Sequence, residues 1–348
     1  MTAIQGVVPA EAADPKMPPG VLVEGPLVDA KFRDSYISFV IMIGGSIAAL
    51  VWAFTQGIGR VEIWVFVGTF AMSTIGVGFM HRLFVHRSFR SGPVMRTLFA
   101  AIATMAVQGS ILKWVSNHRR HHLHSDRPGD VHSPYYDGGG NRIVSFAKGF
   151  MHAQGGWVWD QETTDGEYYA RDIVADPIAM FFTRTRWYWY ALSAIVIPGA
   201  IGYAFGGIHT MIGCILFAGL FRSYLMTMAT SLVNSVCHSD GRYGYRRFEL
   251  DDGTTNELVT TILTFGEGLH NNHHRFPRDA YLSHAWYEID INGLIILGLG
   301  KLGLVHDIFD ARTRQGARSA DTQDGGLGVV AIESPFDRVA EDLRSSGR

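Results

Sequence analysis

Four long stretches of the chain consist of apolar side chains with few charges among them. They cover residues 36–55, 63–80, 187–207 and 211–236. A helix of about 20 residues is about 30 Å long, which matches the hydrocarbon core of a bilayer. Four runs of this length are difficult to bury in the core of a soluble protein. The pattern therefore predicts an all-α integral membrane protein with four transmembrane helices.

The segments outside these runs are polar. Residues 1–35 are rich in proline, alanine and glycine and predict a flexible tail, and residues 313–348 predict a polar C-terminal tail. Arginine is frequent in residues 81–186, whereas the two short connectors between paired runs contain only Arg60 as a basic residue. The positive-inside rule therefore places both tails and the long middle segment in the cytoplasm. We expect residues 36–312 to form one membrane domain with a helical cytoplasmic cap.

Composition excludes some functions and highlights one residue type. The formal net charge is −2, which argues against a nucleic-acid partner, because nucleic-acid binding relies on a basic surface. The 2 cysteines lie in apolar sequence and indicate neither a disulfide framework nor a thiolate metal site. The 15 histidines outnumber the 12 prolines, and most of them fall in tight groups.

Four histidine groups are predicted on the cytoplasmic side of the membrane. They are His81 and His86; His118, His121 and His122; His238, with Asn234 one helical turn before it; and His270, His273 and His274. Positions i, i+3 and i+4 share a helix face, so each HxxHH motif directs three imidazoles to one side. The five-residue spacing of His81 and His86 does not fit a regular helix, so we expect the helix to end or distort between them. In HNNHH, Asn271 and Asn272 are interpreted as spacers, and Phe276-Pro277 is expected to end that helix.

These groups predict a site for two metal ions. A tetrahedral ion needs four ligands and an octahedral ion six, so nine imidazoles are too many for one ion. One HxxHH motif alone is also consistent with a surface cluster, but four groups on one face favour a metal site. Imidazole suits zinc, copper, iron and nickel. Breaking an unactivated C–H bond requires a redox metal and O2, which favours iron.

The motifs HRLFVHRSF, NHRRHHLHSD, NSVCH and GEGLHNNHHRFP, in this order around four apolar runs, resemble those of the membrane-bound fatty acid desaturases. The resemblance is to the stearoyl-CoA (acyl-CoA Δ9) desaturase-like branch, of a bacterial type without a fused cytochrome b5, and it covers about residues 36–310. It implies an enzyme that introduces a cis double bond into a saturated acyl chain. It also implies two iron ions (Fe2+/Fe3+, with zinc as a substitute in overexpressed protein) and O2 as co-substrate. The ligands that it implies are His81, His86, His118, His121, His122, His238, His270, His273 and His274, with Asn234 holding a metal-bound water.

The resemblance further implies partners and a location. The expected partners are a fatty acyl substrate, membrane lipids and a separate electron donor, which would be a ferredoxin, a rubredoxin or a cytochrome b5 with its reductase. The expected location is the bacterial inner membrane, crossed several times, with the active site and both termini in the cytoplasm. The nearest alternative function is a related diiron lipid hydroxylase or monooxygenase. A non-catalytic membrane metal-binding protein is a further alternative, although a transporter would place its ligands near the bilayer midplane.

One departure from the family pattern leaves the acyl carrier open. Animal members that use acyl-CoA have Arg-Asp just before the second histidine box, where this chain has Ser116 and Asn117. Losing a cation that pairs with phosphate weakens the case for coenzyme A, so acyl-CoA, acyl carrier protein and phospholipid all stay open. The arginines that would still be available for an anionic head group are Arg119, Arg120, Arg184 and Arg186.

Further residues are candidates for supporting the metal ligands or for contacting substrate. They are Trp114, Asn117, His124, Asp126, His132, Trp157 and Glu267. Glu267 and Asp126 are expected to accept N–H groups from ligand histidines. The two tryptophans are candidates for the wall of an acyl channel. His152, His209, His284 and His306 are expected to make ordinary polar contacts, with His209 on the far side of the membrane.

Overall fold

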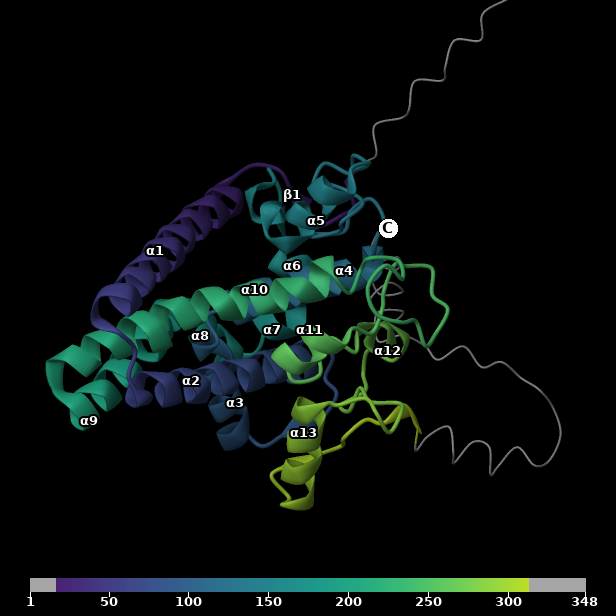
Figure 1. Cartoon of the computed structure of the whole chain (residues 1–348). Coiled ribbons are helices and arrows are strands. Elements are labelled where there is room, and N and C mark those ends of the chain that lie inside the picture. The colour runs from purple at the N-terminus through teal and green to yellow at the C-terminus, as the bar shows by residue number, and fades with distance from the viewer. Residues whose placement is uncertain (1–16, 313–348) are drawn as a thin grey trace, which may run out of the picture.

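The computed structural model describes residues 17–312, and its regular structure is almost entirely helical (Figure 1). The C-terminal tail predicted at 313–348 and the first part of the N-terminal tail lie outside the described residues. The helices are α1 (Pro26–Gln56), α2 (Arg60–Phe79), η1 (Met80–Val85), α3 (Pro93–Met105), α4 (Ile111–His124), α5 (Phe146–Gln154), η2 (Gly156–Trp159), α6 (Gly166–Tyr169), α7 (Arg171–Val174), α8 (Pro177–Ala191), η3 (Leu192–Val196), α9 (Ile197–Gly213), η4 (Cys214–Phe221), α10 (Arg222–Ser235), α11 (Leu258–Leu263), α12 (His270–Arg275) and α13 (Ile291–Lys301). The strands are β1 (Val21–Leu22), β2 (Arg90–Ser91), β3 (Thr163–Thr164) and β4 (Val305–His306), and β1 pairs with β3 and β2 with β4, both antiparallel.

Three helices in the described part of the chain are long and apolar enough to cross a membrane. They are Pro26–Gln56, Arg60–Val85 and Pro177–Ser235. The third, 59 residues long, contains a residue with non-helical backbone, Gly207, whose φ of 69° is readily adopted only by glycine. The stretch doubles back there, and its two limbs touch so closely that a Cβ on Gly219 would lie 1.8 Å from the carbonyl oxygen of Ala194. The runs predicted at 187–207 and 211–236 are therefore the two limbs of one bent stretch.

The first long helix begins earlier than the apolar pattern indicates, which corrects part of the predicted tail 1–35. Helix α1 starts at Pro26, and the preceding β1 pairs with β3. Proline suits the first position of a helix because its fixed φ angle is already helical. The hydropathy pattern missed this start because it detects only the apolar part of α1. Lys31 is buried in this added segment and its Nζ donates to the carbonyl oxygens of Asp160 and Glu162 at 2.8 and 2.6 Å.

The shorter elements gather at one end of the long helices (Figure 1). A buried apolar cluster joins the second long helix to α3, α4 and α8 and includes Phe84, Phe99, Ile111 and Phe182. This cluster fixes α4, which contributes three of the predicted ligand histidines, against the membrane helices.

A buried arginine ties the second long helix to the C-terminal part of the domain. Arg82 in η1 is 1% exposed, and its guanidinium donates to both carboxylate oxygens of Asp290 at 2.8 and 2.9 Å and to Glu267 at 3.0 Å. The carboxylate of Asp290 also accepts the backbone N–H groups of Leu282 and Gly293. Removing one partner of a buried ion pair leaves an uncompensated charge, which is far more costly than losing an exposed pair.

Replacing Arg82 with methionine is expected to lower the free energy of unfolding by about 3–5 kcal/mol, because two buried carboxylates lose their cation. The matched control is Arg90→Met, which removes an exposed pair with Asp307, with side chains 76% and 62% exposed, and should change stability by less than about 1 kcal/mol. Thermal unfolding of the two variants in the same detergent measures the difference. Equal melting temperatures would contradict the role of Arg82.

Candidate metal centre and cavity

Five histidines from three segments converge on one point. They are His81 in η1, His86 directly after it, His118 and His122 on α4, and His273 on α12, and their ligating nitrogens lie within 4.8 Å of one another. The expected distortion between His81 and His86 is present as the π-helical turn η1, in which the His86 N–H donates to the His81 carbonyl at 3.2 Å. A π turn places residues five apart on the same face, and this explains the unusual spacing.

Four further histidines form a second group. They are His121 on α4, His238 just after α10, and His270 and His274 on α12, again with nitrogens within 4.8 Å of one another. The Nε2 atoms of His238 and His270 are 3.0 Å apart, and those of His121 and His274 are 3.3 Å apart.

Neighbouring residues on two helices divide between the groups. On α4, His121 faces the second group and His122 the first, and on α12 His274 faces the second and His273 the first. Successive helical residues differ by about 100°, so neighbours direct their rings to two adjacent points. The ring centroids of His122 and His274 are 4.5 Å apart, so the two groups adjoin.

Four largely buried carboxylates fix the outer nitrogens of ligand candidates. The Nδ1 contacts are His81 to Glu267 at 2.5 Å, His121 to Asp130 at 2.9 Å, His238 to Asp126 at 2.8 Å and His274 to Asp252 at 2.8 Å. A proton held on Nδ1 by a carboxylate leaves the Nε2 lone pair facing inward, as in the supporting shell of metal sites.

Sequence reasoning found two of these carboxylates and missed two. Glu267 and Asp126 contact ligand candidates, as expected. Asp130 and Asp252 were not singled out, because both lie in loops and have no helical spacing to the histidines they contact. The only available signal was the acidic character of the ELDD stretch that contains Asp252.

Burial and mutual repulsion keep most of these imidazoles neutral. For His118, His122 and His270, burial and the neighbouring histidines hold the pKa well below its usual value. Neutral imidazole is the form that ligates a metal. His238 differs: burial acts in the same direction, but the Asp126 carboxylate outweighs it and raises the pKa of His238 to about 9.

The two asparagines of HNNHH, Asn271 and Asn272, are not only spacers, because their side chains bind α12 to neighbouring loops. The Asn271 side chain accepts the backbone N–H groups of Arg247 and Phe248 at 2.8 and 2.7 Å. Asn272 donates to the Glu288 carboxylate at 2.9 Å. Both asparagines are fully buried, so α12 is held from the side opposite to its histidines. As expected, α12 ends just before Phe276 and Pro277.

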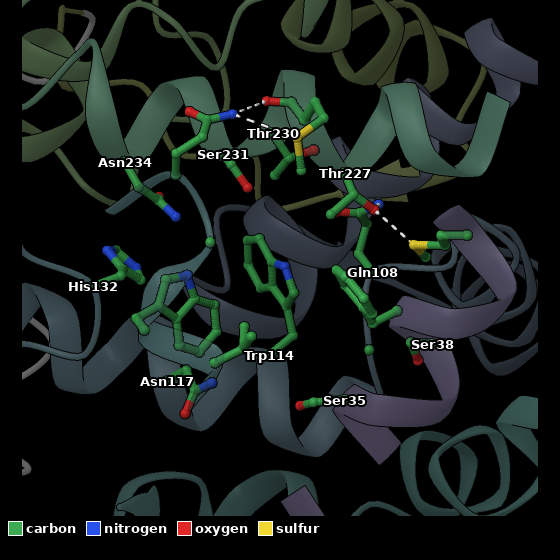
Figure 2. Close-up of a pocket in the computed structure, with 18 of the residues that line it drawn as sticks. Ser35, Ser38, Gln108, Trp114, Asn117, His132, Thr227, Thr230, Ser231 and Asn234 are labelled. Atoms are coloured by element: carbon green, nitrogen blue, oxygen red, sulfur yellow. Dashed lines mark hydrogen bonds between the residues drawn. The ribbon is translucent and has the colours of Figure 1, made fainter. Parts of the chain in front are cut away.

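A cavity of about 790 Å³ lies beside the five-histidine group, between α1, α4, α5, η2 and α10 (Figure 2). Its volume is in the range of small-molecule sites. His118 lies in its wall, and the Trp114 ring stacks on His118 with centroids 5.0 Å apart and planes 7° apart. Other residues singled out in the sequence also line it, among them Trp114, Asn117, His132, Trp157 and Asn234.

His132 connects the cavity to the second histidine group. One of its ring nitrogens lies within 4.8 Å of a ring nitrogen of His121 and of a carboxylate oxygen of Asp130, and its ring centroid is 5.8 Å from that of Trp157. His124, by contrast, belongs to none of the metal-binding groups found in residues 17–312.

The arginines considered for a head group have other roles. Arg120 is fully buried and pairs with Glu162, and Arg119 binds the Asp172 carboxylate at 2.5 and 3.0 Å. The prediction that Arg119 and Arg120 are available for an anionic head group is therefore wrong. The polar residues of HRRHH do not reveal in the sequence that this face of α4 is buried. Arg184 is exposed, while Arg186 lines the cavity and pairs with Asp34.

The remaining histidines make ordinary contacts, as expected. His152 lies 2.8 Å from an oxygen of Asp160, His284 lies 3.1 Å from one of Asp279, and the ring of His209 lies against Trp52. His306 lies in β4.

The residues present fit two metal ions. Each group supplies enough imidazole nitrogens for one ion, all close to a common point, and four of the rings are fixed from outside by carboxylates. The centre stands at the end of long apolar helices and beside a cavity. These features define a membrane protein with a histidine-rich site suited to a dinuclear metal centre.

Comparison with known proteins identifies the family. Residues 32–291 match the family model of the fatty acid desaturases, and the chain belongs to this family. It is 35% identical to hex-5-enoyl-[acyl-carrier protein] acetylenase of Moorena producens, over 76% of this chain and 82% of that protein. It is 31% identical to sn-1 stearoyl-lipid 9-desaturase of Anabaena variabilis, over 69% and 80%, and 33% identical to sn-2 palmitoyl-lipid 9-desaturase of a Nostoc species, over 66% and 74%.

Proposed function

We propose that this desaturase uses O2 and two iron ions to introduce a cis double bond into a saturated acyl chain. The observation that carries the proposal is the cavity that passes directly beside one of two adjoining histidine groups. The names of the relatives supply the substrate class, which is an acyl chain carried by a lipid or by an acyl carrier protein. Coenzyme A stays open as a third carrier.

The nine histidines would hold the two ions, five around one and four around the other. Bound iron would supply the activation of O2, which no side chain supplies. In the overall reaction, two adjacent CH2 groups each lose one hydrogen, and O2 with two electrons and two protons becomes two waters. The electrons come from a separate donor, which would be a ferredoxin, a rubredoxin or a cytochrome b5 with its reductase.

The cavity residues would bind and orient the acyl chain. Trp114 fixes the ring of His118 by stacking and presents an apolar surface beside it. An acyl chain in this cavity would exclude water from the reacting carbons. Asn234 faces the same cavity from α10, one turn before His238, and its amide is suited to hold a water near the metal ligands.

We infer that the two limbs of Pro177–Ser235 each cross the membrane, which gives four spans together with Pro26–Gln56 and Arg60–Val85. Arginine-rich segments lie at the histidine end of these helices, which supports a cytoplasmic cap with both termini on the same side. Such a protein would reside in the inner membrane of a bacterium.

Expression in a bacterial host of known lipid profile is expected to produce new mono-unsaturated acyl chains, measured by mass spectrometry. His122→Ala should abolish these products, because the Nε2 atom of His122 lies at the centre of the five-histidine group, 2.9 Å from the Nε2 atoms of both His118 and His273. The control is His209→Ala: His209 lies on α9 against Trp52 of α1 and belongs to neither group, so the product should be unchanged. A hydroxylated product without an olefin would exclude desaturation and indicate a hydroxylase.

Gently purified protein is expected to contain about two metal ions per chain, and Asp252→Asn should weaken metal retention about 10–100-fold by removing the carboxylate that orients His274. The matched control is Asp251→Asn, a neighbouring carboxylate that is 94% exposed, which should retain metal like the parent. Metal per chain is measured during titration with a chelator. Equal metal retention in Asp252→Asn and Asp251→Asn would contradict the role of Asp252. A single ion that stays bound in His274→Ala would contradict a dinuclear centre.

A further inference from the structure

One half-buried cation in the cavity wall has no partner among residues 17–312, whereas the other unpartnered lysine of the wall, Lys148, is exposed. Lys113, in the first turn of α4, lines the cavity, but its Nζ makes no hydrogen bond or ion pair within the described chain. Nearby cations are satisfied: Lys31 donates to backbone carbonyls and Arg186 pairs with Asp34. A half-buried cation without a partner is less well satisfied than one in water, so a bound molecule that supplies an acceptor would stabilise it.

The position of Lys113 defines a polar end of the cavity. Lys113 and Asn117 are one turn apart on α4, and Trp114 and His118 are one turn apart on the adjacent face. Figure 2 shows Asn117 on one side of Trp114 and Thr230 and Asn234 on the other.

Charged groups lie at this end of the cavity. Asp34 and Arg186 both line the wall and both lie close enough to act electrostatically on Lys113. The wall also contains uncharged side chains such as Met42 and Thr227. A molecule with one polar end and a long apolar chain would match this division.

We propose that Lys113 donates a hydrogen bond to the carbonyl oxygen at the head end of the acyl chain, and so fixes which carbons lie beside His118. The inference deepens the proposed function and rests on it. The ester or thioester carbonyl is the acceptor common to lipid, acyl carrier protein and coenzyme A substrates.

The chemistry of the amine suits this role. Burial, together with the nearby charge of Lys31, lowers the pKa of Lys113 to about 8. The amine therefore keeps its proton at neutral pH and remains a donor, although less firmly than an exposed lysine. Lys113 and His118 are separated by a rigid helical rise of about 7.5 Å. A carbonyl held by Lys113 would thus place the double bond at a constant distance from the head end, independent of chain length.

The test compares the full-length protein with Lys113→Met and Lys113→Arg in one host supplied with palmitic and stearic acids. Double-bond positions are mapped by mass spectrometry separately in membrane lipids and in the thioester pool, which distinguishes ester from thioester substrates. The parent is expected to place the bond at one position counted from the carbonyl in both chain lengths. Lys113→Met should spread the product over several positions and lower its yield about tenfold, the loss expected for one hydrogen bond from a charged donor. Lys113→Arg should keep the parent position.

Controls separate this inference from the proposed function. Lys301→Met changes an exposed lysine at the end of α13 and should leave position and yield unchanged. Protein amount and metal per chain are measured for every variant, and Lys113→Gln replaces Lys113→Met if the latter fails to accumulate. A single unchanged position in the uncharged variant, or a parent that counts from the methyl end, would overturn the role of Lys113. A parent that makes no olefin would instead overturn the proposed function.

Discussion

The structure depends on holding nine imidazoles buried, close together and directed inward. Neutral imidazoles tolerate this crowding, and a ring of known orientation needs a partner on its outer nitrogen. Four carboxylates from three loops provide these partners, at 2.5–2.9 Å. These loops contain little regular secondary structure. The contacts between their carboxylates and the histidines hold the loops in defined positions. This end of the molecule is therefore organised around the candidate metal centre, and its loops hold the histidines in place.

The same contacts couple the centre to the stability of the domain. Glu267 contacts the outer nitrogen of His81 through one oxygen and the guanidinium of Arg82 through the other. Arg82 in turn holds Asp290, which caps the start of α13 by accepting the N–H of Gly293. Buried charges of this kind persist only when every partner is in place. A change at the centre is thus transmitted to the junction between the second long helix and the C-terminal elements.

The sequence predicted the parts of the site that follow a helical period. HxxHH spacing marks His118, His121 and His122, and the irregular spacing of His81 and His86 correctly indicated a distorted helix. Asp130, Asp252 and Arg82 were missed, because nothing in the sequence links these polar residues to the partners they contact in the fold. Hydropathy found all the apolar runs. It could not show that α1 begins at Pro26, because a helix start is set by backbone geometry rather than by lipid contact.

Helix α4 combines three functions that would otherwise need separate elements. Its C-terminal half supplies histidines to both groups, Trp114 forms the wall of the cavity, and Lys113 places a single donor at the polar end. All three lie on one rigid rod, which buried contacts with η1 and α8 fix in place. A flexible loop would let the distance between a held carbonyl and the reacting carbons vary. A helix removes that freedom, since its rise per residue is constant. The position at which an acyl chain reacts would then be set by the spacing along α4, while the rest of the cavity has only to accept an apolar chain.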